Sequence, residues 1–127
     1  MIEPYDREVT IPGLKLESLN KAVITASMGA RYGAAKRAKQ QRCLACMILR
    51  AKIGPPPAPP LTIVITRIGP RELDTDNLCG SAKHVRDGVA DWLGVNDRSK
   101  LLTWQYEQQY GGKGVYGVKI RITGGAA

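Results

Sequence analysis

The segment 71–78, RELDTDNL, holds acidic side chains at a spacing that suits the binding of a divalent metal ion. Asp74 and Asp76 stand two residues apart, shortly after a strongly apolar run. Two carboxylates held close together repel each other, which raises one pKa unless a cation lies between them. Mg²⁺ takes a few carboxylates together with waters and substrate phosphates, and it promotes phosphodiester hydrolysis. The pair therefore favours metal-assisted chemistry on a phosphate. Because Asp-x-Asp is a common spacing, this interpretation also needs support from other residues of the chain.

Each acid in this part of the chain also has an ordinary structural interpretation. One of the residues 74–76 could cap the N-terminus of a helix, where acids are favoured. Lys83 and Asp87, four residues apart, could form an exposed ion pair worth a few tenths of a kcal/mol. Asp97 could be a turn residue in the segment VNDRS. These readings explain the acids one at a time, whereas a metal site explains them together.

The elements that must position these residues start with a helix predicted over 76–94. At about 100° per residue, this segment has one apolar face. The opposite side carries a line of Asp76, Lys83 and Asp87, and Gly94 is expected to end the helix. The residues expected on the apolar face are Leu78, Ala82, Val85, Val89 and Trp92.

The N-terminal half predicts a strand, a helix and a connector. Residues 7–18 read as an edge strand, or as two strand halves broken by the turn Pro12-Gly13. Residues 30–52 are rich in good helix formers, and residues 54–60, GPPPAPP, predict a stiff extended connector. The apolar face expected on the helix consists of Leu44, Met47, Ile48 and Ala51.

The C-terminal half predicts a central strand and a hairpin. Residues 61–68, LTIVITRI, form a nearly continuous apolar run, which predicts a central strand covered on both faces. Residues 100–110 and 114–123 flank GGKG and read as the two strands of a hairpin. The order β, α, β, α, β, β predicts an α/β (α+β) fold with helices packed on a small mixed sheet. We expect a single domain over residues 1–127, with a flexible tail at 124–127.

The charge of the chain is distributed unevenly. The formal net charge is +8, and no acid occurs between Ser18 and Arg71. The positive charges in such a segment repel one another, and binding to a polyanion relieves this repulsion. A surface that binds nucleic acid is therefore a better explanation than a surface that only keeps the protein in solution. This segment holds the ten bases Lys21, Arg31, Lys36, Arg37, Lys39, Arg42, Arg50, Lys52, Arg67 and Arg71. The candidate DNA contacts among them are Lys21, Arg31, Lys36, Arg37, Lys39, Arg42 and Arg71.

Cysteine usage and hydropathy indicate a cytoplasmic protein. Cys43, Cys46 and Cys79 are an odd set, and with His84 as the only histidine they make at most one zinc site. We expect them to be small apolar residues on buried helix faces, in a reducing compartment. No apolar run approaches the roughly 20 residues of a membrane span, and the polar N-terminus is unlike a secretory signal.

The motifs together resemble the RusA family of Holliday-junction resolvases, which occurs in bacteria and their prophages. The resemblance covers residues 60–123 well and the N-terminal half more loosely. It implies a compact α/β homodimer that cuts four-way DNA junctions with Mg²⁺ or Mn²⁺, in recombination and repair. By this resemblance Asp74, Asp76 and Asp97 are the metal-binding carboxylates, and Lys83 is the essential lysine of the following helix. The matching positions are Asp74, Asp76, Asn77, Leu78, Lys83, Asp87, Gly94 and Asp97.

The chain departs from the family pattern at two places. Many members carry the lysine four residues after the second Asp, where this chain has Gly80, and Lys83 follows three residues later. The spacing of four residues from Lys83 to Asp87 is kept. Many members also have Asp-Asp where this chain has Asn96-Asp97, and a neutral amide is a weaker ligand.

Three hypotheses follow from the sequence. The first is a structure-selective, metal-dependent DNA endonuclease that uses the acids and the lysine. The second is a DNA-binding protein that keeps the scaffold but cuts weakly or not at all. The third is an interaction module that uses the proline-rich segment 54–60.

Overall fold

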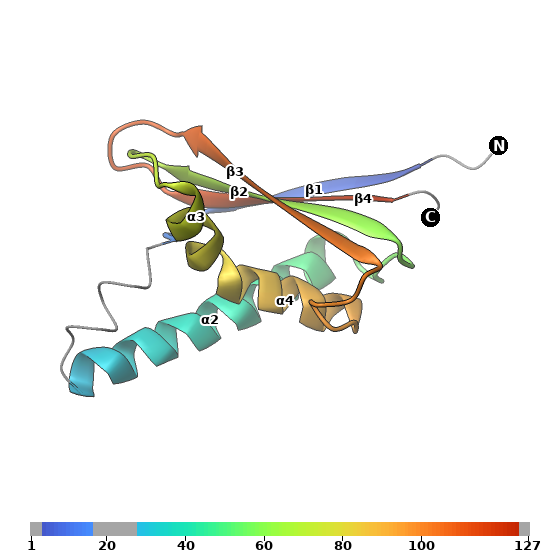
Figure 1. Cartoon of the computed structure of the whole chain (residues 1–127), viewed down its shortest axis with the longest axis horizontal. Helices are drawn as coiled ribbons and strands as arrows, with labels where there is room; N and C mark the ends of the chain where they lie inside the picture. The colour runs from blue at the N-terminus through green and yellow to red at the C-terminus, as the bar shows by residue number, and fades with distance from the viewer. Residues whose placement is uncertain (1–3, 17–27, 125–127) are drawn as a thin grey trace.

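A computed structural model describes residues 4–16 and 28–124 of the chain. It consists of a four-stranded mixed sheet with helices on one face (Figure 1), which confirms the predicted mixed α+β class. The elements are β1 (Tyr5–Pro12), α2 (Met28–Lys52), β2 (Leu61–Gly69), α3 (Thr75–Ser81), α4 (Lys83–Leu93), β3 (Leu102–Tyr110) and β4 (Gly117–Gly124). Among the described residues, no helix is both long and apolar enough to cross a membrane.

The strand order is β1-β4-β2-β3, so the predicted hairpin of residues 100–110 and 114–123 is wrong. Ile65 of β2 pairs with Tyr106 of β3 on one side, in parallel, and with Ile120 of β4 on the other, antiparallel. The apolar strand β2 thus has a partner on each edge. The turn between β3 and β4 passes the end of β2, where the Gly111 N–H donates to the Gly69 carbonyl at 3.4 Å.

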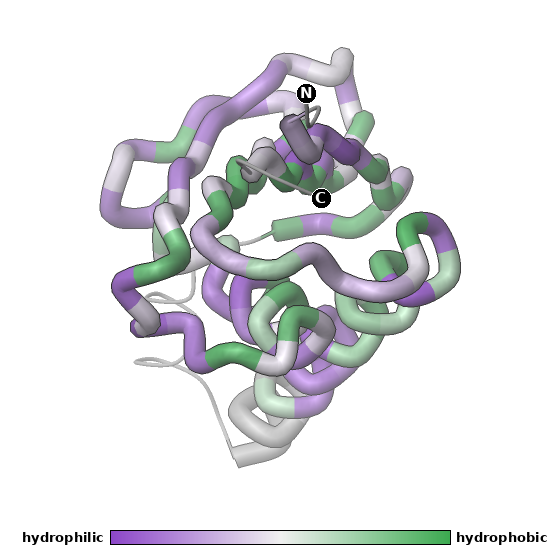
Figure 2. The backbone as a smooth tube through the Cα atoms, turned by 90° about the vertical axis from the view of Figure 1, so that its right-hand side faces the viewer, coloured by the Kyte–Doolittle hydropathy of each residue, from purple (hydrophilic) through white to green (hydrophobic). Residues whose placement is uncertain are grey.

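The core lies between the sheet and the helices. Ile63 and Ile65 of β2 and Ile120 of β4 are at most 1% exposed on the helix-facing side. Figure 2 shows hydrophobic residues interspersed with hydrophilic ones, and in β4 Val118, Ile120 and Ile122 are buried while Lys119 and Arg121 are less so, because successive side chains point to opposite faces. The expectation that 61–68 is covered on both faces is wrong in part. Helices cover only one face (Figure 1), and Val64, on the other face, is only partly buried.

Helix α2 occupies the predicted segment, but it turns a different face to the core. Ala45 and Leu49 are fully buried, whereas Leu44 is 37% and Met47 is 65% exposed. Of the other residues expected on the buried face, Ile48 is partly buried and Ala51 is exposed. The physical reason is the close approach of α4, which small residues permit. A Cβ added at Gly88 of α4 would lie 2.9 Å from the Ala45 Cβ, so α2 presents Ala45 rather than its larger neighbours.

The predicted helix over 76–94 is present as two helices. The chain breaks at Ala82, where φ is −89° and ψ is −3°, and α4 ends at Gly94 with a left-handed φ of 68°. The indole N–H of Trp92 donates to the Gly54 carbonyl at 2.9 Å, which ties α4 to the start of the proline-rich connector. The predicted apolar face is confirmed, since all of its members are buried: Leu78, Ala82, Val85, Val89 and Trp92.

The connector matches its prediction, and the strand predicted over 7–18 does so in part: β1 spans Tyr5–Pro12, residues 14–16 form no strand, and 17–18 lie outside the described residues. β1 lies at the edge of the sheet, paired with β4 alone, and ends at Pro12. Gly13 follows with a φ of 80°, a conformation that favours glycine and turns the chain. Residues 55–60 form neither helix nor strand. The prediction for the cysteines is wrong in part, because Cys43 is exposed and Cys46 and Cys79 are only partly buried, although all three are free thiols.

The contact between α2 and α4 predicts opposite effects of alanine at two helical glycines. At Gly88 a methyl group would press on the Arg42 carbonyl oxygen and the Ala45 Cβ, so Gly88→Ala should lower the free energy of unfolding by about 1–3 kcal/mol. At Gly80 of α3 an added Cβ meets nothing within 4 Å, so Gly80→Ala should raise it by about 0.5–1 kcal/mol. Urea denaturation of both variants measures this, and equal effects of the two substitutions would contradict the close contact.

Candidate functional site

The acidic corner formed by Asp74 and Asp76 lies between β2 and α3. Asp74 is the N-cap of α3: its Oδ1 accepts the Asn77 backbone N–H at 2.9 Å, and its Oδ2 accepts the Asn77 side-chain amide at 3.0 Å. Asp76 lies in the first turn of α3, and both acids are exposed. The capping interpretation is therefore confirmed for Asp74. Each carboxylate oxygen has more than one acceptor site, so capping leaves room for a metal ion.

A side chain of β3 fixes the loop that leads into this corner. The amide of Gln108 donates to the Leu73 carbonyl at 2.7 Å, and its oxygen accepts the Leu73 N–H at 2.7 Å. Because β2 and β3 run parallel, the carboxyl ends of both strands meet here. Ligands of open sheets with parallel strands bind in the crevice outside these ends. The corner therefore lies where ligands commonly bind, and Gln108 attaches the loop before it to β3.

Lys83 and Asp87 do not continue a straight line from Asp76, because the break at Ala82 intervenes. Lys83 is exposed at the start of α4, and Asp87 lies one turn later. Asp87 lines a hollow of about 470 Å³ between α2 and α4, together with His84. The ion pairs found within residues 4–16 and 28–124 do not include Lys83 with Asp87.

The hollow between α2 and α4 is organised by an ion pair. Arg42 contacts Asp91 twice, with Nε–Oδ2 at 2.6 Å and Nη2–Oδ1 at 2.8 Å. These hydrogen bonds hold the pKa of Asp91 below its usual value. Burial lowers the pKa of His84, which favours the neutral imidazole, and the neighbouring Lys83 adds to this effect while Asp87 opposes it. The charge of Arg42, one of the bases of α2, is thus paired with a carboxylate of α4.

Asp97 is held by a cluster of side chains from α4 and β3. The Arg86 guanidinium bonds the Asp97 carboxylate at 3.1 Å (Nε–Oδ2) and its backbone carbonyl at 3.0 Å. It also donates to the Tyr106 hydroxyl at 2.8 Å and lies over the Trp104 ring, 4.7 Å from the centroid. The Trp104 indole donates to the same Asp97 carbonyl at 2.9 Å. Arg86 therefore fixes both the carboxylate and the backbone of Asp97.

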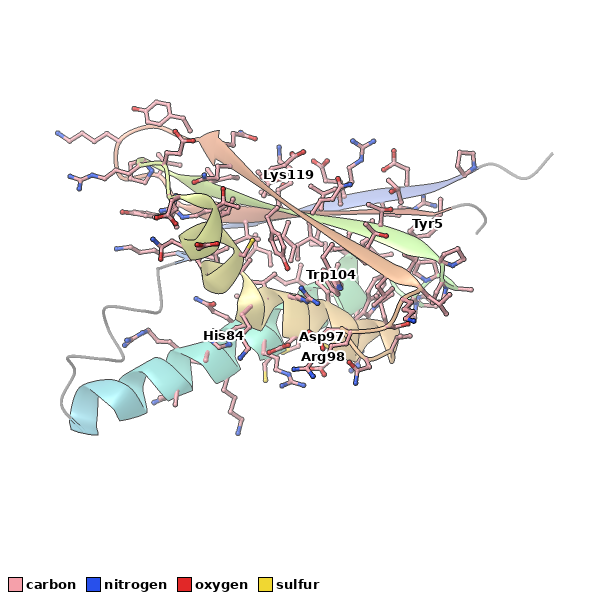
Figure 3. All side chains as sticks on the ribbon, viewed as in Figure 1. Tyr5, His84, Asp97, Arg98, Trp104 and Lys119 are labelled. Atoms are coloured by element: carbon pink, nitrogen blue, oxygen red, sulfur yellow. The ribbon has the colours of Figure 1, made fainter. Side chains whose placement is uncertain are left out.

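Asp97 is not brought to the acidic corner within one chain. Figure 3 shows Asp97 beneath Trp104, below the right-hand part of α4, while α3 lies at the left-hand end of α4. Asp97 folds back against Arg86, in the first half of α4, whereas Asp74 and Asp76 lie at the start of α3. Within the part of the chain that the structure describes, no group of three His, Cys, Asp or Glu residues could hold a metal ion. The three proposed carboxylate ligands are therefore split as a pair and a single residue.

The candidate DNA-contacting bases fall in several settings. Lys36, Arg37 and Lys39 are exposed on α2, and Lys36 and Lys39 line an open hollow of about 550 Å³. Arg71 is exposed in the loop before the acidic corner. Arg42 is exposed but paired with Asp91. Lys21 and the side chain of Arg31 lie outside the described residues.

Comparison with known proteins adds no relative to this picture. The chain matches no protein-family model and no curated protein sequence. The interpretation of the site therefore rests on its own residues and their geometry.

Two arginines at structurally important positions escaped the sequence analysis. Arg86 received no role, although it holds Asp97, Trp104 and Tyr106 together. Arg67 was counted only as one base in the acid-free segment, yet it is 7% exposed. The signal for Arg67 was available, because it follows Ile65 by two residues and so shares the core face of β2.

The Arg86 cluster predicts a large difference between two neighbouring arginines. Arg86→Met should lower the free energy of unfolding by about 1–3 kcal/mol, because it removes charge-assisted hydrogen bonds from a partly buried carboxylate. It should also change the fluorescence of Trp104, whose ring loses its cation. Arg98→Met is the matched control: its side chain is exposed, so the change should stay within about 0.5 kcal/mol. Denaturation curves that coincide for the two variants would contradict the role of Arg86.

Proposed function

We propose that this chain is a Mg²⁺-dependent, structure-selective DNA endonuclease of the RusA type, which cuts four-way junctions. The observation that carries the proposal is the pair of exposed carboxylates, Asp74 and Asp76, at a corner fixed by Gln108. The net charge of +8 suits a partner that carries phosphates, and the two acids, at a position where ligands commonly bind, suit a metal ion.

The residues of the corner fit a hard divalent cation. Asp74 and Asp76 offer carboxylate oxygens, the ligand type that Mg²⁺ and Mn²⁺ prefer. When bound, the ion would activate water and stabilise the leaving oxygen of a phosphodiester. Lys83 is exposed at the start of the next helix, where it could offset the charge of a phosphate. Exposed Lys36, with the neighbouring bases of α2, supplies the salt-sensitive part of DNA binding.

Among the described residues Asp97 is not grouped with Asp74 and Asp76, so we propose that a second copy of the chain supplies it to the same phosphate. The outer edge of β3 meets no strand among the described residues. Its sequence, LTWQYEQQY, contains no Lys or Pro, two residues that commonly protect an edge from pairing, and Glu107 is its one charged residue. Antiparallel pairing of two β3 edges about a two-fold axis would set the start of one strand beside the end of the other. Asp97 of one copy would then approach the Asp74–Asp76 corner of its partner.

A second candidate function is a DNA-binding protein that does not cut. It is favoured by the Asp97 carboxylate, which is already paired with Arg86. Gly80 in place of the usual lysine, and the neutral Asn96, point the same way. This candidate predicts salt-sensitive binding to branched DNA without cleavage in any divalent metal.

Cleavage of a synthetic four-way junction in Mg²⁺ or Mn²⁺ tests the proposed centre. Asp74→Asn is a sharp variant, because asparagine caps a helix as well as aspartate does but carries no charge. Asp74→Asn and Asp76→Asn should each lower the cleavage rate by about 100-fold or more. Glu8→Gln, an equal charge change on the exposed edge of β1, should leave the rate unchanged.

Two outcomes separate the candidates. Metal-dependent cutting that persists in Asp76→Asn removes this centre. Tight binding by the wild type with no cutting in either metal supports the non-cutting protein instead.

Mixing two inactive variants tests whether the site is shared between copies. Asp76→Asn and Asp97→Asn should each be inactive, and each should sediment at twice the mass of the chain. In a shared site, a mixed dimer has one site with both substitutions and one site with neither. Mixing equal amounts under subunit exchange should therefore restore about a quarter of the wild-type sites. No recovery, with exchange verified by two affinity tags, would contradict the shared site.

A further inference from the structure

Arg67 places a positive charge at a core position of β2. It shares the helix-facing side of the strand with Ile63 and Ile65 and is 7% exposed. Its Nε donates to the Leu16 carbonyl at 3.2 Å, and its Nη1 donates to the Arg71 carbonyl at 2.6 Å. Both acceptors are neutral, so the charge itself is not balanced by these bonds.

Within residues 4–16 and 28–124, no carboxylate forms an ion pair with Arg67. A guanidinium has five N–H donors, and the two hydrogen bonds use two of them. A buried charge is costly unless it is paired and hydrogen-bonded. Arg67 therefore has both the charge and the free donors to bind an anion.

Arg67 lines a cavity of about 410 Å³ at the carboxyl ends of β2 and β3. Gly69 forms part of its wall, and a Cβ there would lie within 2.9 Å of the guanidinium atoms. Only glycine at this position leaves room for the planar group. The volume falls within the range of small-ligand pockets, which is roughly 300–1,000 Å³.

The rest of the wall suits one nucleotide rather than a bare anion. Arg71 adds a second guanidinium, and Tyr110 adds an aromatic ring that is 73% exposed. Arginine forks bind phosphate oxygens in pairs, and an exposed aromatic ring stacks on a base of any sequence. Glu72, an exposed carboxylate, also lines the cavity and opposes an anion there. Its removal should therefore tighten binding.

We propose that this cavity binds a single nucleotide of the DNA strand next to the acidic corner, with its phosphodiester on Arg67 and Arg71 and its base on Tyr110. The inference rests on the proposed function, because DNA supplies the ligand. It goes beyond that function by assigning a strand-positioning pocket that contains none of the proposed metal ligands. The loop 70–74 joins the pocket to Asp74, so a nucleotide held here would fix the strand beside the corner.

Binding of a thymidine hexanucleotide in EDTA tests the pocket without any cleavage. Arg71→Gln should weaken binding about tenfold and reduce the salt slope by roughly 0.7, the loss of one phosphate contact on a single strand. Tyr110→Leu should weaken it about tenfold through lost stacking. Glu72→Gln should strengthen it. Arg98→Gln, the same charge change at an exposed arginine on the α4–β3 loop, should have a smaller effect than Arg71→Gln.

Arg67 itself is tested in two ways. Arg67→Lys keeps the charge but loses the planar fork, so it should weaken hexanucleotide binding more than it changes stability. If that variant does not fold, the Arg67 Nε–H resonance of the ¹⁵N-labelled wild type serves instead, and it should shift in saturable fashion with added hexanucleotide. Inorganic phosphate should shift the same resonance with lower affinity and without dependence on Tyr110.

The outcomes separate this pocket from the proposed function. If Arg71→Gln and Tyr110→Leu bind as Arg98→Gln does, or if the Arg67 resonance does not move, the pocket is wrong even when junctions are cut. If hexanucleotide binding follows the expected pattern but no junction is cut in either metal, the endonuclease function fails and the pocket stands.

Discussion

The parallel pairing of β2 with β3 determines where every candidate residue lies. Parallel neighbours cannot be joined by a tight turn, so the chain must cross back over one face of the sheet, and α3 and α4 make this crossing. The carboxyl ends of both strands consequently meet at one edge, which creates the acidic corner and allows Gln108 to hold Leu73. The same crossing leaves Asp97 in the loop before β3, against Arg86 and Trp104 and apart from the corner. The pairing of β2 with β3 thus positions two ligands of the proposed metal site, Asp74 and Asp76, and leaves the third, Asp97, elsewhere.

Local signals predicted much of this architecture. Neighbouring residues alone predict α2 from its helix formers, β2 from its apolar run, and the end of α4 at Gly94. They also predict the apolar face of 76–94. The order of the strands in the sheet cannot be predicted from neighbouring residues. Residues 100–110 and 114–123 look like a hairpin because they are adjacent, whereas β2 separates them through contacts made about 40 to 60 residues apart in the chain. The face of α2 was also unpredictable, because it depends on Gly88 of another helix.

The candidate site was predictable to the extent that its chemistry is local. Asp74 caps α3 as its residue type and position suggest, and Asp76 follows in the same turn. The setting of Asp97 depends instead on three elements, since Arg86 comes from α4 and Trp104 from β3. Arg67 illustrates a different limit. Counting bases treats every arginine as surface charge, although the alternation of β2 assigns this one to the core, beside the corner where the acids lie.

Pairing with Arg86 weakens Asp97 as a ligand but also prepares it for that role. A cation beside the carboxylate competes with a metal ion for the same negative charge. However, Arg86 contacts only Oδ2 and the backbone carbonyl, and Asp97 remains partly exposed. Groups that orient a ligand from behind commonly tune metal sites in this way. The arrangement is therefore that of a single, fixed carboxylate presented beside an open strand edge. Among the described residues it joins no other acids in a metal site, and the proposed pairing of two copies along β3 would give its position a chemical use.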